Sequence, residues 1–266
     1  MDAESQGGAP PQPADRLRAE PADRLRAEPA HRLQAEPAHR LRAGISSRAE
    51  IAEAGRVLSG LGLVTAFGHV SARAGARILI TPATDLAEVS PADLVEVDLA
   101  ATSLPAGAPA ETWAHLRVYA GRPGVGAIAR AQPPPAFAVA AVATELPLLH
   151  GQACWLGRTV PVHDEASLLR SLDLADAAAR RLGESDALLL RGNGALTCGA
   201  TPGHAAVRMW LLTMACQAWL AASASGTPRL MTAAEIESWR AVQDELLPRL
   251  WQHLRRSVAR RTKAMP

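Results

Sequence analysis

Lysine is almost absent from this sequence of 266 residues. Arginine supplies nearly all of the basic charge, and the one lysine, Lys263, lies close to the C-terminus. A Schiff-base mechanism needs a desolvated lysine amine in a pocket. Because the interior of the chain offers no such amine, the sequence argues strongly against imine-forming catalysis.

Cysteine, net charge and long apolar runs are also scarce. The three cysteines are far apart and lack metal-type spacing, which is typical of buried thiols in a reducing compartment. A net charge of +2 gives no electrostatic case for a nucleic-acid partner. The longest apolar stretch, Met209 to Ala222, is short for a bilayer and carries Thr213 and Gln217, so we expect a core helix and no membrane partner. The polar N-terminus lacks the apolar segment of a signal peptide, and we expect a cytoplasmic protein.

Residues 13–44 repeat an octapeptide four times: PADRLRAE, PADRLRAE, PAHRLQAE and PAHRLRAG. A proline every eight residues prevents a continuous helix, and one leucine per repeat cannot build a core. We predict a disordered tail over residues 1–44. A tether or partner-binding arm is the alternative, and the acidic residues argue against a targeting peptide.

The remaining residues, 45–266, alternate between short apolar runs and helical patterns, which predicts one layered α/β domain. Strands are expected at residues 77–81, 94–98, 127–131, 148–154 and 187–191. Helices are expected at residues 49–61, 111–120, 134–144, 167–182, 202–222 and 233–258.

The glycine clusters do not indicate a nucleotide site. Gly60-Leu-Gly62 and Gly192-Asn-Gly194 both lack the rest of a dinucleotide-binding fingerprint, and there is no Walker-type phosphate loop. No serine nucleophile elbow is present either. We therefore expect no organic cofactor.

Four segments in order carry a family pattern. They are GLVTAFGHVSAR (62–73), ILITPATDLAEVSPADLVEVD (78–98), PAETWAHLRVYAGRPGVGAIARAQPP (109–134) and ALLLRGNGALTCGAT (187–201). Together they resemble the class II aldolase/adducin superfamily, with fuculose-phosphate-type aldolases among its members. The resemblance implies a three-layer α/β/α domain with a central mixed or antiparallel sheet. It also implies a homotetramer with active sites between subunits.

In that family three histidines hold a divalent metal, two from an H-x-H on a strand and one from an R-x-H-G loop. A glutamate joins them or acts as acid/base. The glutamate is retained here as Glu111, and a histidine four residues later as His115, but the ligand positions read Arg130, Gln132 and Asn193. Arginine cannot ligate a metal, and amides are poor ligands for zinc. We predict that this site binds no metal.

Other histidines do not rebuild a metal site in the sequence. His69 lies in a turn that the resemblance places at the substrate, while His150, His163 and His204 fall near family loops. None of them has ligand spacing with another, and a lone histidine is more often a hydrogen-bonded structural residue. A relocated metal site is therefore disfavoured, and so is iron-dependent oxygenase chemistry.

Two functions remain open. The first is a metal-independent enzyme acting beside a carbonyl (lyase, decarboxylase, dehydratase, isomerase or cyclase), with Glu111 as acid/base and Arg130 binding an oxyanion or carboxylate. The second is a non-catalytic scaffold like the adducin head domain. Because Ala110 stands where serine is usual for phosphate, a small carboxylate or polyketide-like substrate is favoured over a sugar phosphate. The residues expected to bind substrate are His69, Ser71, Thr81, His115, Gln132 and Asn193.

Overall fold

The computed structural model describes residues 48–264, which form a mixed sheet covered by helices on both faces. The strands lie in the order β3-β2-β1-β4-β8-β7-β6-β5, and neighbouring strands pair antiparallel except for β6 with β7. Their bounds are β1 His69–Ala74, β2 Arg77–Ile80, β3 Val95–Asp98, β4 Ala127–Ala131, β5 Glu145–Leu146, β6 Val160–His163, β7 Ala187–Leu190 and β8 Gly194–Gly199.

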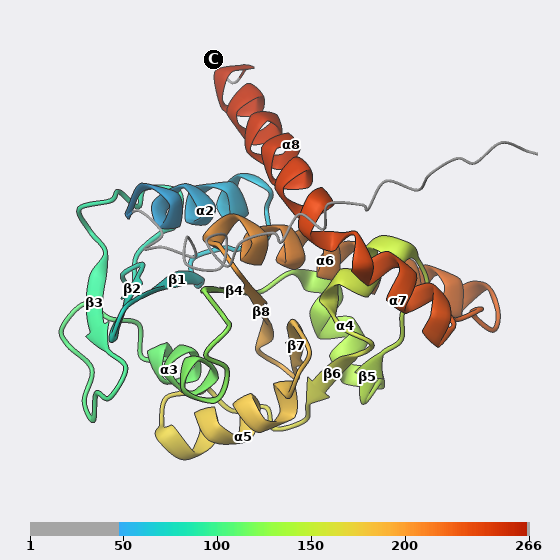
Figure 1. The fold of residues 1–266 in the computed structure, drawn as a ribbon, viewed down its shortest axis with the longest axis horizontal. Helices are drawn as coiled ribbons and strands as arrows, with labels where there is room; N and C mark the ends of the chain where they lie inside the picture. The colour runs from blue at the N-terminus through green and yellow to red at the C-terminus, as the bar shows by residue number, and fades with distance from the viewer. Residues whose placement is uncertain (1–47, 265–266) are drawn as a thin grey trace, which may run out of the picture. The chain divides into compact units, whose positions relative to one another are not determined.

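The helices divide between the two faces of the sheet (Figure 1). One face packs against α2, α4 and α6 through one apolar cluster, and the other packs against α3 and α5 through a second. The bounds are α2 Arg48–Gly60, α3 Thr112–Gly121, α4 Pro134–Val142, η1 Gly151–Leu156, α5 Leu172–Leu182, α6 Pro202–Ser225, α7 Ala233–Ala241 and α8 Gln243–Ala264. This is the three-layer α/β/α arrangement that the sequence predicts.

The central strand β4 shows how the sequence builds these layers. Its alanines at 127, 129 and 131 face the α6 side, where their small side chains let the helix pack closely against the sheet. Ile128 belongs to the opposite cluster, with α3 and α5. Side chains alternate between the faces of a strand, so Arg130 shares the α3 side with Ile128. The strand therefore presents one buried arginine at its end, on the face that α3 covers.

Helix α6 is the one described helix long and apolar enough to cross a membrane by length and composition. Its 18-residue apolar window is 56% buried within the protein. Contacts with β4 and β8 make it the core helix that the sequence predicts. The three cysteine thiols are buried and free, also as predicted.

Three sequence predictions are wrong in part. The expected strand at 148–154 is instead η1, a 3-10 helix that the His150 side chain caps by accepting a hydrogen bond from the Ala153 N–H. The expected C-terminal helix is two helices, with the break at Val242. The helix expected from residue 167 begins at Leu172, because the Ser171 side chain caps it there. The predicted tail, residues 1–44, lies outside the described residues.

Candidate active site

One end of the sheet gathers most of the candidate residues. Arg130 on β4 and His69 on β1 are direct cross-strand partners. Glu111 lies immediately before the first turn of α3, which covers this face. The sheet register and the helix start thus bring together three residues that are up to 61 positions apart in sequence.

The Glu111 carboxylate is surrounded by donors. Its Oε1 accepts hydrogen bonds from Asn193 Nδ2 at 2.8 Å and from the backbone N–H of Leu169 at 3.1 Å. Its Oε2 accepts a long hydrogen bond of 3.4 Å from Arg130 Nη2 and lies 3.8 Å from His69 Nε2. The side chain is 13% exposed, whereas that of Arg130 is 1% exposed.

These neighbours decide the charge of the site. Burial by itself would raise the pKa of Glu111, but the contact with His69, the charge of Arg130 and the Asn193 amide together hold that pKa well below its ordinary value. Burial lowers the pKa of Arg130 and the Glu111 charge opposes this, yet a guanidinium stays protonated at neutral pH. The pair is therefore a carboxylate beside a guanidinium.

A line of buried polar side chains continues from His69 into the protein. His69 Nδ1 lies 2.7 Å from His115 Nε2, and His115 Nδ1 lies 2.7 Å from Ser71 Oγ. Ser71 Oγ in turn lies 2.9 Å from the Tyr119 hydroxyl. Burial lowers the pKa of both histidines below the ordinary value, so both rings are neutral at neutral pH.

A tight turn places Asn193 over the end of β4. Asn193 lies between Gly192 (φ 69°) and Gly194 (φ 87°) in the turn from β7 to β8. A Cβ atom on Gly194 would lie 2.4 Å from the carbonyl oxygen of Ala131, so glycine alone permits this close approach. The turn therefore carries the Asn193 amide to Glu111.

The same end of the sheet holds buried polar atoms that lack hydrogen-bond partners. Among the described residues these atoms are Arg130 Nε, Gln132 Oε1 and His163 Nε2. Arg130 and Gln132 lie at the end of β4, and His163 ends β6. Buried polar groups in native proteins are nearly always paired, so such a group calls for an explanation such as a bound water or ligand.

Thr81, expected at the substrate, is engaged elsewhere. Its buried hydroxyl accepts a hydrogen bond of 3.1 Å from the backbone N–H of Val70, and its own N–H donates to the Val70 carbonyl. Both bonds hold β1 in place. Tyr119, Leu169 and His163 are not among the predicted site residues. The spacing of Glu111, His115 and Tyr119, each four residues apart on one helix face, is a signal for Tyr119, whereas nothing in the sequence marks the backbone of Leu169.

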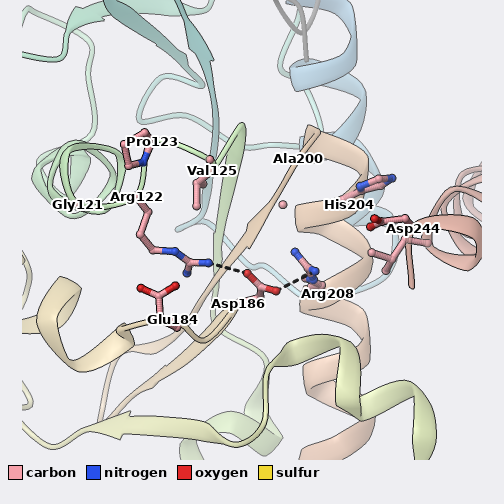
Figure 2. Close-up of a pocket in the computed structure, with 13 residues that line it drawn as sticks. Gly121, Arg122, Pro123, Val125, Glu184, Asp186, Ala200, His204, Arg208 and Asp244 are labelled. Atoms are coloured by element: carbon pink, nitrogen blue, oxygen red, sulfur yellow. Dashed lines mark hydrogen bonds and ion pairs between the residues drawn. The ribbon is translucent and has the colours of Figure 1, made fainter. Parts of the chain in front are cut away.

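The described cavities lie away from Glu111. The cavity shown in Figure 2 has a volume of about 430 Å³ and sits at the opposite end of β4, beside Val125. In it Asp186 forms ion pairs of 2.9 Å with both Arg122 and Arg208 (Figure 2). His204 lines this cavity and therefore does not belong to the group of residues around Glu111. Two further cavities, of about 360 and 350 Å³, also exclude Glu111 and Arg130.

Comparison with known proteins places the chain. Residues 49–220 match the model of the class II aldolase and adducin N-terminal domain. The chain belongs to this family. No curated protein matches the sequence significantly. Among solved structures, an L-fuculose 1-phosphate aldolase matches with a TM-score of 0.69 and 23% identity, over 75% of this chain and 97% of that one.

Two further solved structures share the fold. An L-fuculose-1-phosphate aldolase from Thermus thermophilus matches with a TM-score of 0.62 and 29% identity, covering 69% of this chain and 99% of that one. An aldolase II superfamily protein from Pseudomonas syringae matches with a TM-score of 0.68 and 23% identity, covering 83% of this chain and 97% of that one. These similarities establish the fold.

The residues that the sequence resemblance places at the metal position, Arg130, Gln132 and Asn193, do not have the chemistry of ligands for a divalent cation. The guanidinium of Arg130 lies within 3.4 Å of the Glu111 carboxylate, where it already supplies a positive charge. Asn193 and Gln132 add amides, and the Asn193 amide directs an N–H at that carboxylate. Within residues 48–264, no group of three or more histidine, cysteine, aspartate or glutamate side chains could hold a metal.

Proposed function

We propose that this class II aldolase relative is a metal-independent enzyme that acts beside a carbonyl of a small oxygenated substrate. Lyase, decarboxylase, dehydratase, isomerase and cyclase reactions share the first step, in which charge develops on the carbonyl oxygen. Arg130 stabilises that oxygen, and Glu111 moves a proton. The contact between Glu111 and Arg130, with its surrounding neutral donors, carries the proposal.

The cost of this cluster supports a catalytic role. A buried ion pair is seldom more stabilising than apolar side chains of the same volume, because both charges lose water. Here the guanidinium also leaves Nε without a partner, and Gln132 and His163 add further unpaired atoms at the same end of the sheet. Strongly perturbed ionisable groups of this kind gather at functional sites.

The geometry also supplies a way to activate the base. In the described state Glu111 is a weak base, because His69, Arg130 and Asn193 together lower its pKa against the effect of burial. When a substrate oxygen takes the hydrogen bonds of Arg130 Nη2 and Asn193 Nδ2, the carboxylate loses those donors and its pKa rises. In a dehydration, isomerisation or cyclisation Glu111 then removes a proton from the carbon beside the carbonyl, whereas in a lyase or decarboxylase reaction the electron pair comes from the C–C bond that breaks. The electron pair moves to the carbonyl oxygen, which faces Arg130.

The donors define the class of substrate. Arg130 and Asn193 suit a carbonyl or carboxylate oxygen, since a guanidinium binds carboxylates through paired N–H groups. Ala110 replaces the serine that the family uses for phosphate, so a small carbonyl acid or polyketide-like compound is favoured over a sugar phosphate. We further propose a cytoplasmic homotetramer, without a nucleic-acid or membrane partner.

One observation favours a second function, an adducin-head-like scaffold. Both oxygens of Glu111 already have protein donors, and the described cavities lie elsewhere. In a scaffold the Glu111–Arg130 pair would simply hold α3 to β4.

A ligand-stabilisation screen separates the two. Pyruvate, oxaloacetate, phosphoglycolate and dihydroxyacetone phosphate serve as probes in a thermal unfolding assay. A probe at 100 times its Kd raises the free energy of unfolding by about 2.7 kcal/mol. We expect the carbonyl acids to stabilise the wild type and also Glu111→Gln, in which Arg130 and Asn193 keep their donors and lose the competing carboxylate, but not Arg130→Met. Arg208→Met, which alters a buried arginine at the other cavity, is the matched control and should still bind. Equal responses in all four proteins would refute the enzyme proposal.

A further inference from the structure

Strand β1 and helix α3 meet along a row of polar side chains. His69 and Ser71 are two residues apart on the strand and therefore face the same side. His115 and Tyr119 are four residues apart on α3 and share one helix face. The two rows interlock in the order His69, His115, Ser71, Tyr119, and each of the four residues is at most 6% exposed.

The buried end of this row determines the direction of its hydrogen bonds. Among the described residues, Ser71 Oγ is the side-chain acceptor within reach of the Tyr119 hydroxyl proton. If Tyr119 donates to Ser71, the Ser71 hydroxyl is free to donate to His115 Nδ1. A neutral imidazole with an acceptor Nδ1 carries its proton on Nε2, so His115 donates to His69 Nδ1. His69 must then carry its own proton on Nε2.

The opposite direction is unfavourable at both ends. It would place the His69 proton on Nδ1 and turn the lone pair of Nε2 toward the Glu111 carboxylate, 3.8 Å away. It would also leave one buried hydroxyl proton, that of Ser71 or that of Tyr119, without an acceptor among the described residues, because only one of the two hydroxyls can donate to the other. An unsatisfied buried donor costs about 1–3 kcal/mol. The contacts at Glu111 and at Tyr119 therefore both favour the arrangement in which His69 and His115 carry their protons on Nε2.

We propose that His115 and Ser71, with Tyr119 behind them, are positioning residues that hold His69 as the neutral Nε2–H tautomer with its N–H toward Glu111. This proposal rests on the proposed function for its catalytic meaning: His69 becomes an uncharged donor for a substrate oxygen beside Glu111. A neutral imidazole can polarise a carbonyl without delivering its proton.

The row is a positioning device and not a path for protons to solvent. Tyr119 is 1% exposed and Ser71 is fully buried, so the far end is closed. Burial also raises the pKa of the Tyr119 phenol far above its ordinary value, so the terminal group keeps its proton.

The tautomers can be read directly from the full-length protein. Long-range proton–nitrogen NMR spectra of protein labelled with nitrogen-15 histidine distinguish Nε2–H from Nδ1–H rings, and single His→Gln variants assign the signals. At pH 7 we expect His69 and His115 both to be neutral Nε2–H tautomers. A wild-type His69 that carries its proton on Nδ1, or that is doubly protonated, overturns the proposal without any variant.

Two substitutions test the cause. Ser71→Ala removes the donor to His115, so we expect a mixture of tautomers at both rings, and Ser71→Thr, which restores a hydroxyl, should return the Nε2–H form. Thr213→Val is the matched control: it removes a buried hydroxyl that bonds the Met209 carbonyl on α6, and it should leave both rings unchanged. Unchanged tautomers in Ser71→Ala would overturn the positioning role.

Probe binding separates this inference from the proposed function. Ser71→Ala should weaken the binding of a carbonyl acid by about 2- to 10-fold, the effect of one neutral hydrogen bond. If no probe binds the wild type but the predicted tautomers are present, the proposed function fails and the positioning of His69 stands. If probes bind the wild type but the predicted tautomers are absent, the positioning of His69 fails and the proposed function stands.

Discussion

Replacing Arg130 by methionine is the most informative single change. The substitution keeps a long side chain but removes the guanidinium, which donates to Ala131 and to Glu111. Removing one partner of a fully buried ion pair typically destabilises by about 3–5 kcal/mol. Two features reduce that figure here: Glu111 is partly exposed, and it keeps hydrogen bonds from Asn193 and Leu169.

We therefore expect Arg130→Met to lower the free energy of unfolding by about 1.5–3 kcal/mol, the usual contribution of a hydrogen bond to a charged group. For a domain of this size, each 1 kcal/mol lowers Tm by about 2–4 °C. Urea unfolding gives the stability, and probe binding or turnover gives the functional effect. If Arg130 stabilises an oxyanion, turnover should fall by about 100-fold or more.

Two further variants sharpen this test. Arg130→Lys keeps a positive charge but loses the planar fork, so it should retain most of the stability while binding a carboxylate poorly. Arg208 has four hydrogen-bond or ion-pair partners and is 7% exposed, so Arg208→Met should cost more stability and leave probe binding intact. An Arg130→Met protein with unchanged stability and unchanged activity would refute the reasoning.

Metal content, the N-terminal repeats, assembly and pH dependence can each be tested separately. Elemental analysis should find no stoichiometric zinc, iron or manganese, and about one metal per chain retained against mild chelation would contradict this. A truncated protein beginning at Gly44 should melt within a few degrees of the full chain; a large loss of stability would show that the octapeptide repeats contribute to folding. Sedimentation at micromolar concentration should reveal a tetramer, and a monomer would also weaken the catalytic proposal. Because the buried histidines have lowered pKa values, the unfolded state binds more protons below about pH 6.5; stability should fall with decreasing pH by up to about 1.4 kcal/mol per pH unit for each ring, and His115→Gln should flatten this slope.

The spacing of apolar residues predicts most of the helices and strands of the three layers. It fails where a side-chain cap sets the start of a helix. The apolar run at 148–154 has the length of a strand, but apolar composition cannot distinguish a short buried strand from a short helix. The His150 side chain accepts a hydrogen bond from the Ala153 N–H and starts a 3-10 turn. At the C-terminus the apolar stripe continues past Val242 although the backbone does not, so the pattern predicts one helix where the structure has two.

The sequence predicts some residues of the site but not the contacts between all of them. Family motifs locate Glu111, Arg130 and Asn193, and the structure joins all three by hydrogen bonds. Nothing in the sequence alone could pair His69 with His115, because that contact depends on the register of β1 against β4 and on the rotation of α3. Polar residues two positions apart on β1 and four positions apart on α3 each share a face, but this spacing predicts a contact between them only when β1 and α3 are known to pack together.

In the proposed enzyme an arginine takes the place of a metal ion, and this changes how the site can be controlled. A bound cation can be removed by chelators and exchanged for another ion, whereas a guanidinium is covalently fixed and stays charged across physiological pH. The charge of this site at neutral pH therefore depends on the protonation of Glu111, since His69 and His115 are buried and neutral. Under the proposed function, a substrate oxygen that takes Arg130 from Glu111 would raise the pKa of that carboxylate directly, so binding of the substrate and activation of the base would be one event.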